Sequence, residues 1–126
     1  LQDRFGALSA SLIVGAIWAV WHVPLFLYPN EAAPYYGRPF WGLLVTVLLI
    51  SVLFTWVWNN TGGSIFAVLI FHTMFNLSHW VFPAVENDTA GLLLFALQFV
   101  LVLLVVLLCG PRSLGRARGA PPGGRL

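Results

Sequence analysis

The sequence predicts an all-α fold, a multi-pass transmembrane helical bundle with four spans. Of the 126 residues, 60% are hydrophobic and only 8% are charged, whereas a soluble domain carries about a quarter charged residues. Four apolar stretches are separated by segments rich in turn-forming residues, and each is long enough to approach the thickness of a bilayer as a helix. We therefore expect a connector at residues 1–6, a four-helix membrane domain at residues 7–110 and a disordered tail rich in Arg, Gly and Pro at residues 111–126.

The first span is expected at residues 7–28, after the polar connector LQDRFG. Pro24 lies inside this stretch, and proline removes a backbone hydrogen bond and clashes with the preceding turn. We therefore expect the helix to kink or stop just after His22. The loop at residues 30–39 carries two tyrosines that suit a membrane interface, and the second span, at residues 40–58, has tryptophans near both ends as in an aromatic belt.

The third span is expected at residues 64–82, after the turn sequence NNTGG. Ser64 is a good N-cap because its hydroxyl can accept a hydrogen bond from the first helical turn. The helix should stop before Pro83. A short acidic loop then leads to a fourth span at residues 90–110, which is rich in leucine and valine.

Charge predicts the topology. Four spans place both ends of the chain on one side of the membrane. The arginines on that side are Arg4, Arg112, Arg116, Arg118 and Arg125. Only Arg38 falls on the other side, so the positive-inside rule predicts a cell-membrane protein with both ends cytoplasmic. The basic residues are local to one end of a span, and they indicate topology and no nucleic-acid partner. The single cysteine, Cys109, excludes an intrachain disulfide.

The third span is organised around three polar side chains. His72, Asn76 and His79 fall on one face of a helix. Polar groups are costly in hydrocarbon, so this face should meet the bundle interior, a cavity or a partner. The remaining histidine is His22 in the first span, and we expect it to face His72. Counted from the cytoplasmic ends, however, His22 lies about 22 Å deep and His72 about 12 Å deep at the standard helical rise.

These residue types can support chemistry, although each also has a structural interpretation. A neutral imidazole can transfer a proton, bind a metal or polarise a carbonyl. The Asn76 carboxamide can hydrogen-bond a water or an oxyanion. No carboxylate lies inside a predicted span, so the usual general base of a hydrolase is missing. A structural role is the favoured interpretation for His79, near the outer interface, and for Gln98 in the fourth span.

Two runs of the chain resemble conserved blocks of the CPBP intramembrane proteases, which include CAAX prenyl endopeptidases and bacteriocin-processing or immunity proteins. RFGALSASLIVGAIWAVWHVPLFL resembles the block built on aromatic-x-x-x-His, matched by Trp18 and His22. NNTGGSIFAVLIFHTMFN resembles the His-x-x-x-Asn block, matched by His72 and Asn76. The Glu-Glu-x-x-x-Arg block of the family is absent from the 126 residues, and we expect it shortly upstream of Leu1.

The resemblance implies a hydrolase, an intramembrane endopeptidase in which a glutamate activates water. Its substrates would be peptides or C-terminal tails of membrane-associated proteins, met at the lipid bilayer. By the same resemblance, His22 would orient the water or share its proton, His72 and Asn76 would stabilise the oxyanion, and Trp18 would support them. No cofactor is firmly implied. A divalent metal such as zinc stays open, with His22 and His72 as its ligands. Because the glutamate block is missing, we expect these 126 residues to be inactive on their own.

Two other classes of function stay open. A catalytically inactive relative could serve as a membrane scaffold or immunity protein. Histidines on two of four spans could also hold a bis-histidine haem, as in small membrane cytochromes. Trp18 and Asn76 weigh against haem because neither has a clear role beside a porphyrin.

Overall fold

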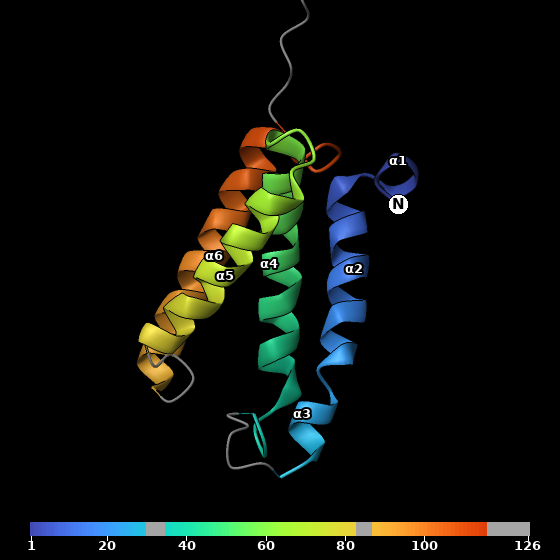
Figure 1. Cartoon of the computed structure of the whole chain (residues 1–126). Coiled ribbons are helices and arrows are strands. Elements are labelled where there is room, and N and C mark those ends of the chain that lie inside the picture. Colours follow the sequence, from blue (N-terminus) through green and yellow to red (C-terminus); the bar gives the residue numbers. More distant parts are fainter. Residues whose placement is uncertain (30–34, 83–86, 116–126) are drawn as a thin grey trace, which may run out of the picture.

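The computed structural model describes residues 1–29, 35–82 and 87–115. Every regular element in these ranges is a helix, and Figure 1 shows the longer ones packed as a bundle. The helices are α1 (Gln2–Phe5), α2 (Ala7–Trp21), α3 (Pro24–Leu27), α4 (Phe40–Asn60), α5 (Ile65–Val81) and α6 (Asp88–Cys109). The predicted fold class, an all-α multi-pass membrane bundle, is thereby confirmed.

Three helical segments are long and apolar enough to cross a membrane. They are Ala7–Leu27, Phe40–Asn60 and Asp88–Cys109. The third predicted span forms α5, which is apolar but shorter, at 17 residues. Four apolar helices thus occupy the four stretches that the sequence singles out.

Local sequence signals place the helix ends. α2 ends at Trp21 and α3 begins at Pro24, so the predicted interruption after His22 is present. At α5, the Ser64 hydroxyl accepts a hydrogen bond of 3.2 Å from the Ala67 N–H, which confirms the predicted N-cap.

The fourth helix starts slightly earlier than the sequence indicates. The Asn87 side chain caps α6 by accepting a hydrogen bond from the Ala90 N–H at 3.0 Å. The helix therefore begins at Asp88, two positions before the expected start of the span. The remainder of the predicted acidic loop, residues 83–86, and residues 30–34 of the preceding loop lie outside the described ranges.

α4 is the central helix of the bundle. It packs against α2, α5 and α6, and Figure 1 shows it between α2 on one side and α5 and α6 on the other. Its side chains Ile50, Val52 and Leu53 are at most 5% exposed and form the middle of the apolar core. α6 is tied to α4 by Gln98, whose buried Nε2 donates a hydrogen bond of 3.0 Å to the Thr46 carbonyl. This contact gives Gln98 the structural role that the sequence favours.

A stripe of small residues brings α2 close to α4. Every fourth residue of α2 is small and buried: Ala7, Ser11, Gly15 and Ala19. A Cβ atom on Gly15 would lie 2.8 Å from the Ser51 Oγ and 3.2 Å from the Leu48 Cα. The Ser11 and Thr55 hydroxyls share a hydrogen bond of 2.8 Å across the same seam. Small residues and hydroxyl pairs are what membrane helices use to pack closely, because lipid supplies no hydrophobic drive between helices.

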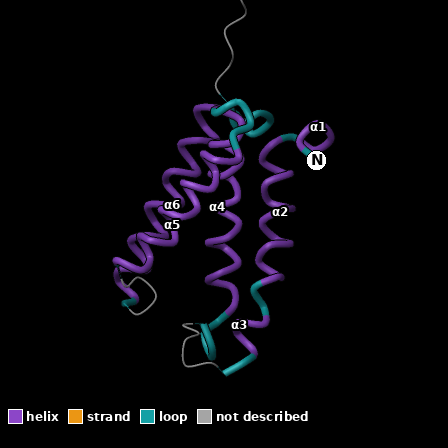
Figure 2. The backbone as a smooth tube through the Cα atoms, viewed as in Figure 1, coloured by secondary structure: helices purple, strands orange, loops and turns teal. Residues whose placement is uncertain are grey.

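The chain after α6 is more ordered than the sequence predicts. Residues 111–115 form turns at the end of the bundle where the N-terminus also lies, and Figure 2 shows these turns beside the start of α2. The Arg112 and Pro111 carbonyls accept hydrogen bonds from the N–H groups of Ala7 and Leu8, at 2.8 Å and 2.9 Å. Those N–H groups have no partner within their own helix, which is the physical reason for the order.

Two further contacts hold this segment in place. Leu114 is 0% exposed, and the Asn59 side chain at the end of α4 donates a 2.6 Å hydrogen bond to the Ser113 carbonyl. The disordered tail expected from residue 111 therefore starts no earlier than residue 116. Residues 116–126, where the remainder of that prediction falls, lie outside the described ranges.

Candidate active site

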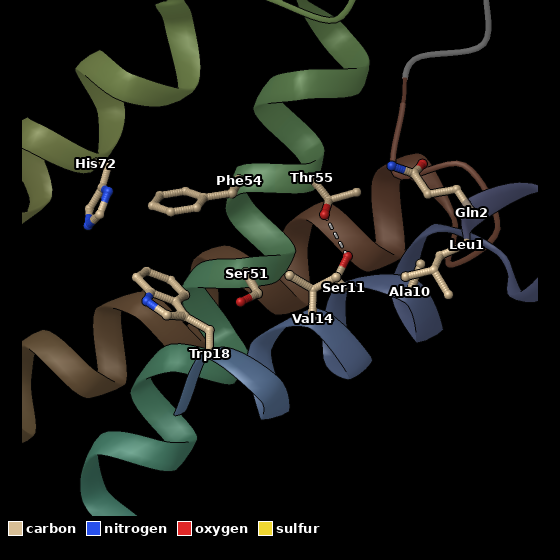
Figure 3. Close-up of a pocket in the computed structure, with 10 residues that line it drawn as sticks. All are labelled: Leu1, Gln2, Ala10, Ser11, Val14, Trp18, Ser51, Phe54, Thr55 and His72. Carbon is tan, nitrogen blue, oxygen red and sulfur yellow. Dashed lines mark hydrogen bonds between the residues drawn. The ribbon is translucent and has the colours of Figure 1, made fainter. Parts of the chain in front are cut away.

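A cleft of about 540 Å³ lies between α2, α4 and α5 (Figure 3). Its lining residues are Leu1, Gln2, Ala10, Ser11, Val14, Trp18, Ser51, Phe54, Thr55 and His72. Aromatic rings and one imidazole surround one part of the cleft, while the Ser11–Thr55 hydroxyl pair lies nearer the N-terminal part of α2. The cleft is therefore mostly apolar but contains a few hydrogen-bonding groups, which is the usual character of a ligand site.

Trp18 connects the two histidines that the sequence singles out. Its ring centroid lies 5.7 Å from that of His22 and 5.4 Å from that of His72, the latter in an edge-to-face arrangement. Within the described residues, no ring contact joins the two imidazoles directly. Trp18 stands one turn before His22, about 6 Å nearer the expected cytoplasmic side, and its ring contacts that of His72. The Trp18 indole thus contacts both histidines despite the predicted difference between their depths in the membrane.

The local backbone fixes how His22 presents its ring. His22 Nδ1 lies 2.8 Å from the Trp18 carbonyl oxygen. A carbonyl oxygen can only accept a hydrogen bond, so in the neutral ring Nδ1 carries the proton and Nε2 presents its lone pair. The C-terminal end of α2, created by Pro24, therefore aims a proton acceptor away from its own helix.

His72 is held differently. Its half-buried ring makes no hydrogen bond within the described part of the chain, and it packs against Trp18 and Phe54, the latter at a centroid distance of 5.3 Å. Both ring nitrogens therefore stay available to a bound molecule. The imidazole lines the cleft, where it can donate or accept a proton.

Asn76 and His79 follow His72 along α5 but lie apart from the ring cluster. Asn76 is exposed and makes no hydrogen bond with the described residues. It stands one turn from His72 on the same face, yet it does not line the cleft. The Nδ1 of His79 donates to the Phe75 carbonyl at 2.9 Å, and its ring centroid lies 4.4 Å from that of Phe75 in a tilted arrangement. The contacts of His79 are thus all local, in keeping with a structural role.

The donor set for a metal is small. Among the described residues, no three His, Cys, Asp or Glu side chains gather where they could hold an ion. The Trp18 indole contacts both His22 and His72, which make no ring contact with each other in the described part of the chain. Zinc sites in proteins use three or four protein ligands, so these residues do not by themselves make one.

Sequence reasoning missed one aromatic residue of the site, Phe54, and the hydroxyl pair Ser11 and Thr55 that lines the cleft. Phe54 lies in the predicted second span, and its place in a mostly apolar run gave no sign of a contact with His72. Ser11 and Thr55 were also overlooked as a pair. The period of four in small residues, through Ser11 and Gly15, is the signal that could have located the α2–α4 seam and the hydroxyls beside it.

Comparisons with known proteins place these features in a family. A family model described as type II CAAX prenyl endopeptidase Rce1-like matches residues 1–78. A protein named CAAX prenyl protease 2 from Methanococcus maripaludis is 29% identical over 94 residues, which is 71% of this chain and 34% of that relative. The chain thus spans about a third of the length of the curated relative that it matches. No solved structure matches the chain.

Proposed function

The chain belongs to the type II CAAX prenyl endopeptidase Rce1-like family, and on this premise we propose that it forms part of the catalytic domain of an intramembrane endopeptidase. The family is membrane-bound, in keeping with the apolar helices of this chain. The proposed substrates are peptides or C-terminal tails of membrane-associated proteins. The observation that carries the proposal is that the Trp18 ring contacts both His22 and His72. Trp18 and His72 line the cleft between the three helices, and His22 lies behind Trp18 without lining it.

The two histidines suit different roles. His22 Nε2 is a proton acceptor because Nδ1 is committed to the Trp18 carbonyl, so His22 orients the attacking water and shares its proton. His72 has no committed nitrogen and can donate to the oxyanion that forms as the carbonyl is attacked. Asn76, one turn further along α5, supplies a second donor once a substrate lies against this exposed face.

The base that removes the proton from water comes from elsewhere in the protein. No carboxylate lines the cleft, and the Glu-Glu-x-x-x-Arg block of the family does not occur in the 126 residues. In the proposed reaction a glutamate takes a proton from water as the water oxygen bonds to the carbonyl carbon. The same proton then passes to the leaving amine as the peptide bond breaks. The residues here supply orientation and charge stabilisation for that step.

The proposed orientation has both ends of the chain in the cytoplasm. The N-terminus and the turns after α6 lie at the same end of the bundle. Arg4 and Arg112 are exposed at this end, and Arg38 is at the opposite one. The positive-inside rule therefore supports a cleft whose Leu1 and Gln2 side faces the cytoplasmic surface. A membrane-associated tail would enter from that side.

One alternative is weakened by the geometry. A bis-histidine haem needs its two imidazoles on opposite faces of an open slot, whereas the Trp18 indole makes ring contact with both His22 and His72. An inactive scaffold or immunity protein is the competing function, and it is separated from the protease by experiment.

The direct test is a cleavage assay on the full-length protein, purified in detergent. The substrate is a prenylated peptide ending in Cys-aliphatic-aliphatic-X, and a copy without the prenyl group shows whether the lipid is required. Mass spectrometry follows release of the C-terminal fragment. We expect His22→Ala to lower cleavage by at least about 100-fold, in the range of general acid–base contributions.

His79→Ala is the matched control, because its contacts are confined to the turn of α5 around Phe75. This variant should cleave like the wild type. Equal activity of wild type and His22→Ala would overturn the assigned role. A wild-type protein that cleaves neither peptide, with His22→Ala unchanged in cellular function, would favour the scaffold, and a Soret band in the purified protein would favour haem.

A further inference from the structure

Phe54 is the member of the ring cluster that comes from the central helix α4. Its centroid lies 5.7 Å from that of Trp18 in a stacked arrangement, 5.3 Å from that of His72 and 5.7 Å from that of Phe71. Figure 3 shows the Phe54 ring between the backbone of α4 and the His72 imidazole, with Trp18 beside both. It thus contacts one side chain from α2 and two from α5.

The contact matters because Phe54 and Trp18 are the two rings that lie against the His72 imidazole among the described residues. His72 makes no hydrogen bond within the described residues. The last side-chain torsion of histidine is broad, with no sharp staggered minima. The ring must therefore take its orientation from the two aromatic surfaces against it, and of these Phe54 stands on α4, the helix that packs against α2, α5 and α6.

We propose that Phe54 is a positioning residue that holds the His72 imidazole at the angle required for oxyanion stabilisation. The inference rests on the proposed function, since it concerns the same site. Phe54 takes part in no proton transfer. It acts by keeping the donor nitrogen of His72 directed into the cleft before charge develops, so that little reorganisation is needed during the reaction.

Substitutions at position 54 distinguish a positioning role, which needs a flat ring, from simple filling of space, which an aliphatic side chain can also provide. Leucine at position 54 would fill most of the space but offers no planar face for the imidazole. Tyrosine keeps the face and adds one hydroxyl to a ring that lines the cleft. If Phe54 only fills space in the core, the leucine variant should perform as well as the tyrosine variant, because volume-conserving changes between apolar residues are tolerated best.

The test compares Phe54→Leu with Phe54→Tyr in the full-length protein. We expect Phe54→Leu to lower kcat by about tenfold, the scale of a small misplacement of a catalytic group, with KM within about twofold of wild type. Phe54→Tyr should keep most of the activity. Phe71→Leu is the matched control, because Phe71 contacts Phe54 but makes no ring contact with His72, and its kcat should stay at the wild-type value.

A second readout does not depend on catalysis. Carbethoxylation of His72 by diethyl pyrocarbonate, followed by mass spectrometry of the peptide, reports how the imidazole is presented. The rate should rise several-fold in Phe54→Leu and stay unchanged in Phe54→Tyr and Phe71→Leu, with His22 as the internal reference. Equal rates and equal kcat in both Phe54 variants would overturn the proposal. If the wild type cleaves no peptide while the His72 rates differ as expected, the proposed function fails and the positioning of the ring stands.

Discussion

The seam between α2 and α4 and the helix α5 are built in opposite ways. At the seam, Ala7 and Ala19 are 0% exposed, and Gly15 leaves no space for a side chain against Ser51. Along α5, none of the described side chains is fully buried. Its connection to the other helices runs through rings, with Phe71 and His72 against Phe54 and His72 against Trp18.

This difference indicates that the α2–α4 seam supports the site, whereas α5 carries side chains that can meet a substrate. Close helix packing through small residues gives a rigid platform, because the backbones themselves are in contact. The platform carries Trp18 and Phe54, and His22 follows directly after α2. α5 brings His72 against the platform, and Asn76 stands one turn further along the helix. Neither side chain has a hydrogen-bond partner among the described residues, so both are available to a bound molecule. The comparison predicts that changes in the seam affect stability and that changes on α5 affect activity.

The largest effect is expected on α5. Asn76→Ala should lower cleavage by about 100-fold, the typical loss when one oxyanion donor is removed, and should leave Tm unchanged because the carboxamide is exposed and unbonded. Activity and thermal unfolding are measured on the same preparation. Thr73→Ala, at another exposed position of α5, is the control and should change neither. A fall in Tm for Asn76→Ala would mean that α5 is held by polar contacts after all.

The next-largest effect is expected from a substitution within the α2–α4 seam. Gly15→Ala should destabilise the protein by about 2 kcal/mol, because its Cβ would meet the Ser51 side chain and the Leu48 backbone. Gly42→Ala is a matched substitution in α4, where an added Cβ meets nothing within 4 Å. This variant should keep or raise Tm, since alanine favours a helix more than glycine does. Equal Tm values for the two variants would show that the backbones are not in close contact.

The smallest effect concerns the hydroxyl pair across the seam. Ser11→Ala and Thr55→Val should each cost about 0.6 kcal/mol, the average for a hydrogen bond between membrane helices. The double variant should cost no more than Ser11→Ala alone, because Thr55→Val removes the bond shared with Ser11, whereas Ser11→Ala also removes the hydrogen bond from the Ser11 hydroxyl to the Ala7 carbonyl. Additive losses in Tm would indicate that the two hydroxyls act separately.

Several parts of this molecule were predictable because they depend on neighbouring residues. The helix break follows from Pro24, the start of α5 from Ser64, and the shared face of His72 and Asn76 from their spacing of four. The family resemblance, carried by the motifs around His22 and His72, agrees with the family match. The roles assigned to these side chains stay predictions for the assays above.

The ordered turns after α6 were not predictable in the same way. The composition around Pro111 and Arg112 predicts the beginning of a disordered tail, because composition indicates only how little apolar surface a segment can bury. Their carbonyls are ordered by the free N–H groups at the start of α2, more than a hundred residues away in the chain. Leu114 is buried in the same contact.

The sequence by itself determined that this protein is a helical membrane bundle, which stretches of the chain form its helices, and which polar residues lie on a common helix face. Composition, periodicity and capping residues are sufficient for this, since they act within a few residues of chain. Only the tertiary structure decided that Trp18 contacts both His22 and His72, that Phe54 packs against His72 from α4, and that the chain after α6 contacts the start of α2. Those contacts join residues far apart in the chain, and they depend on helix tilt and close packing, which no local pattern encodes.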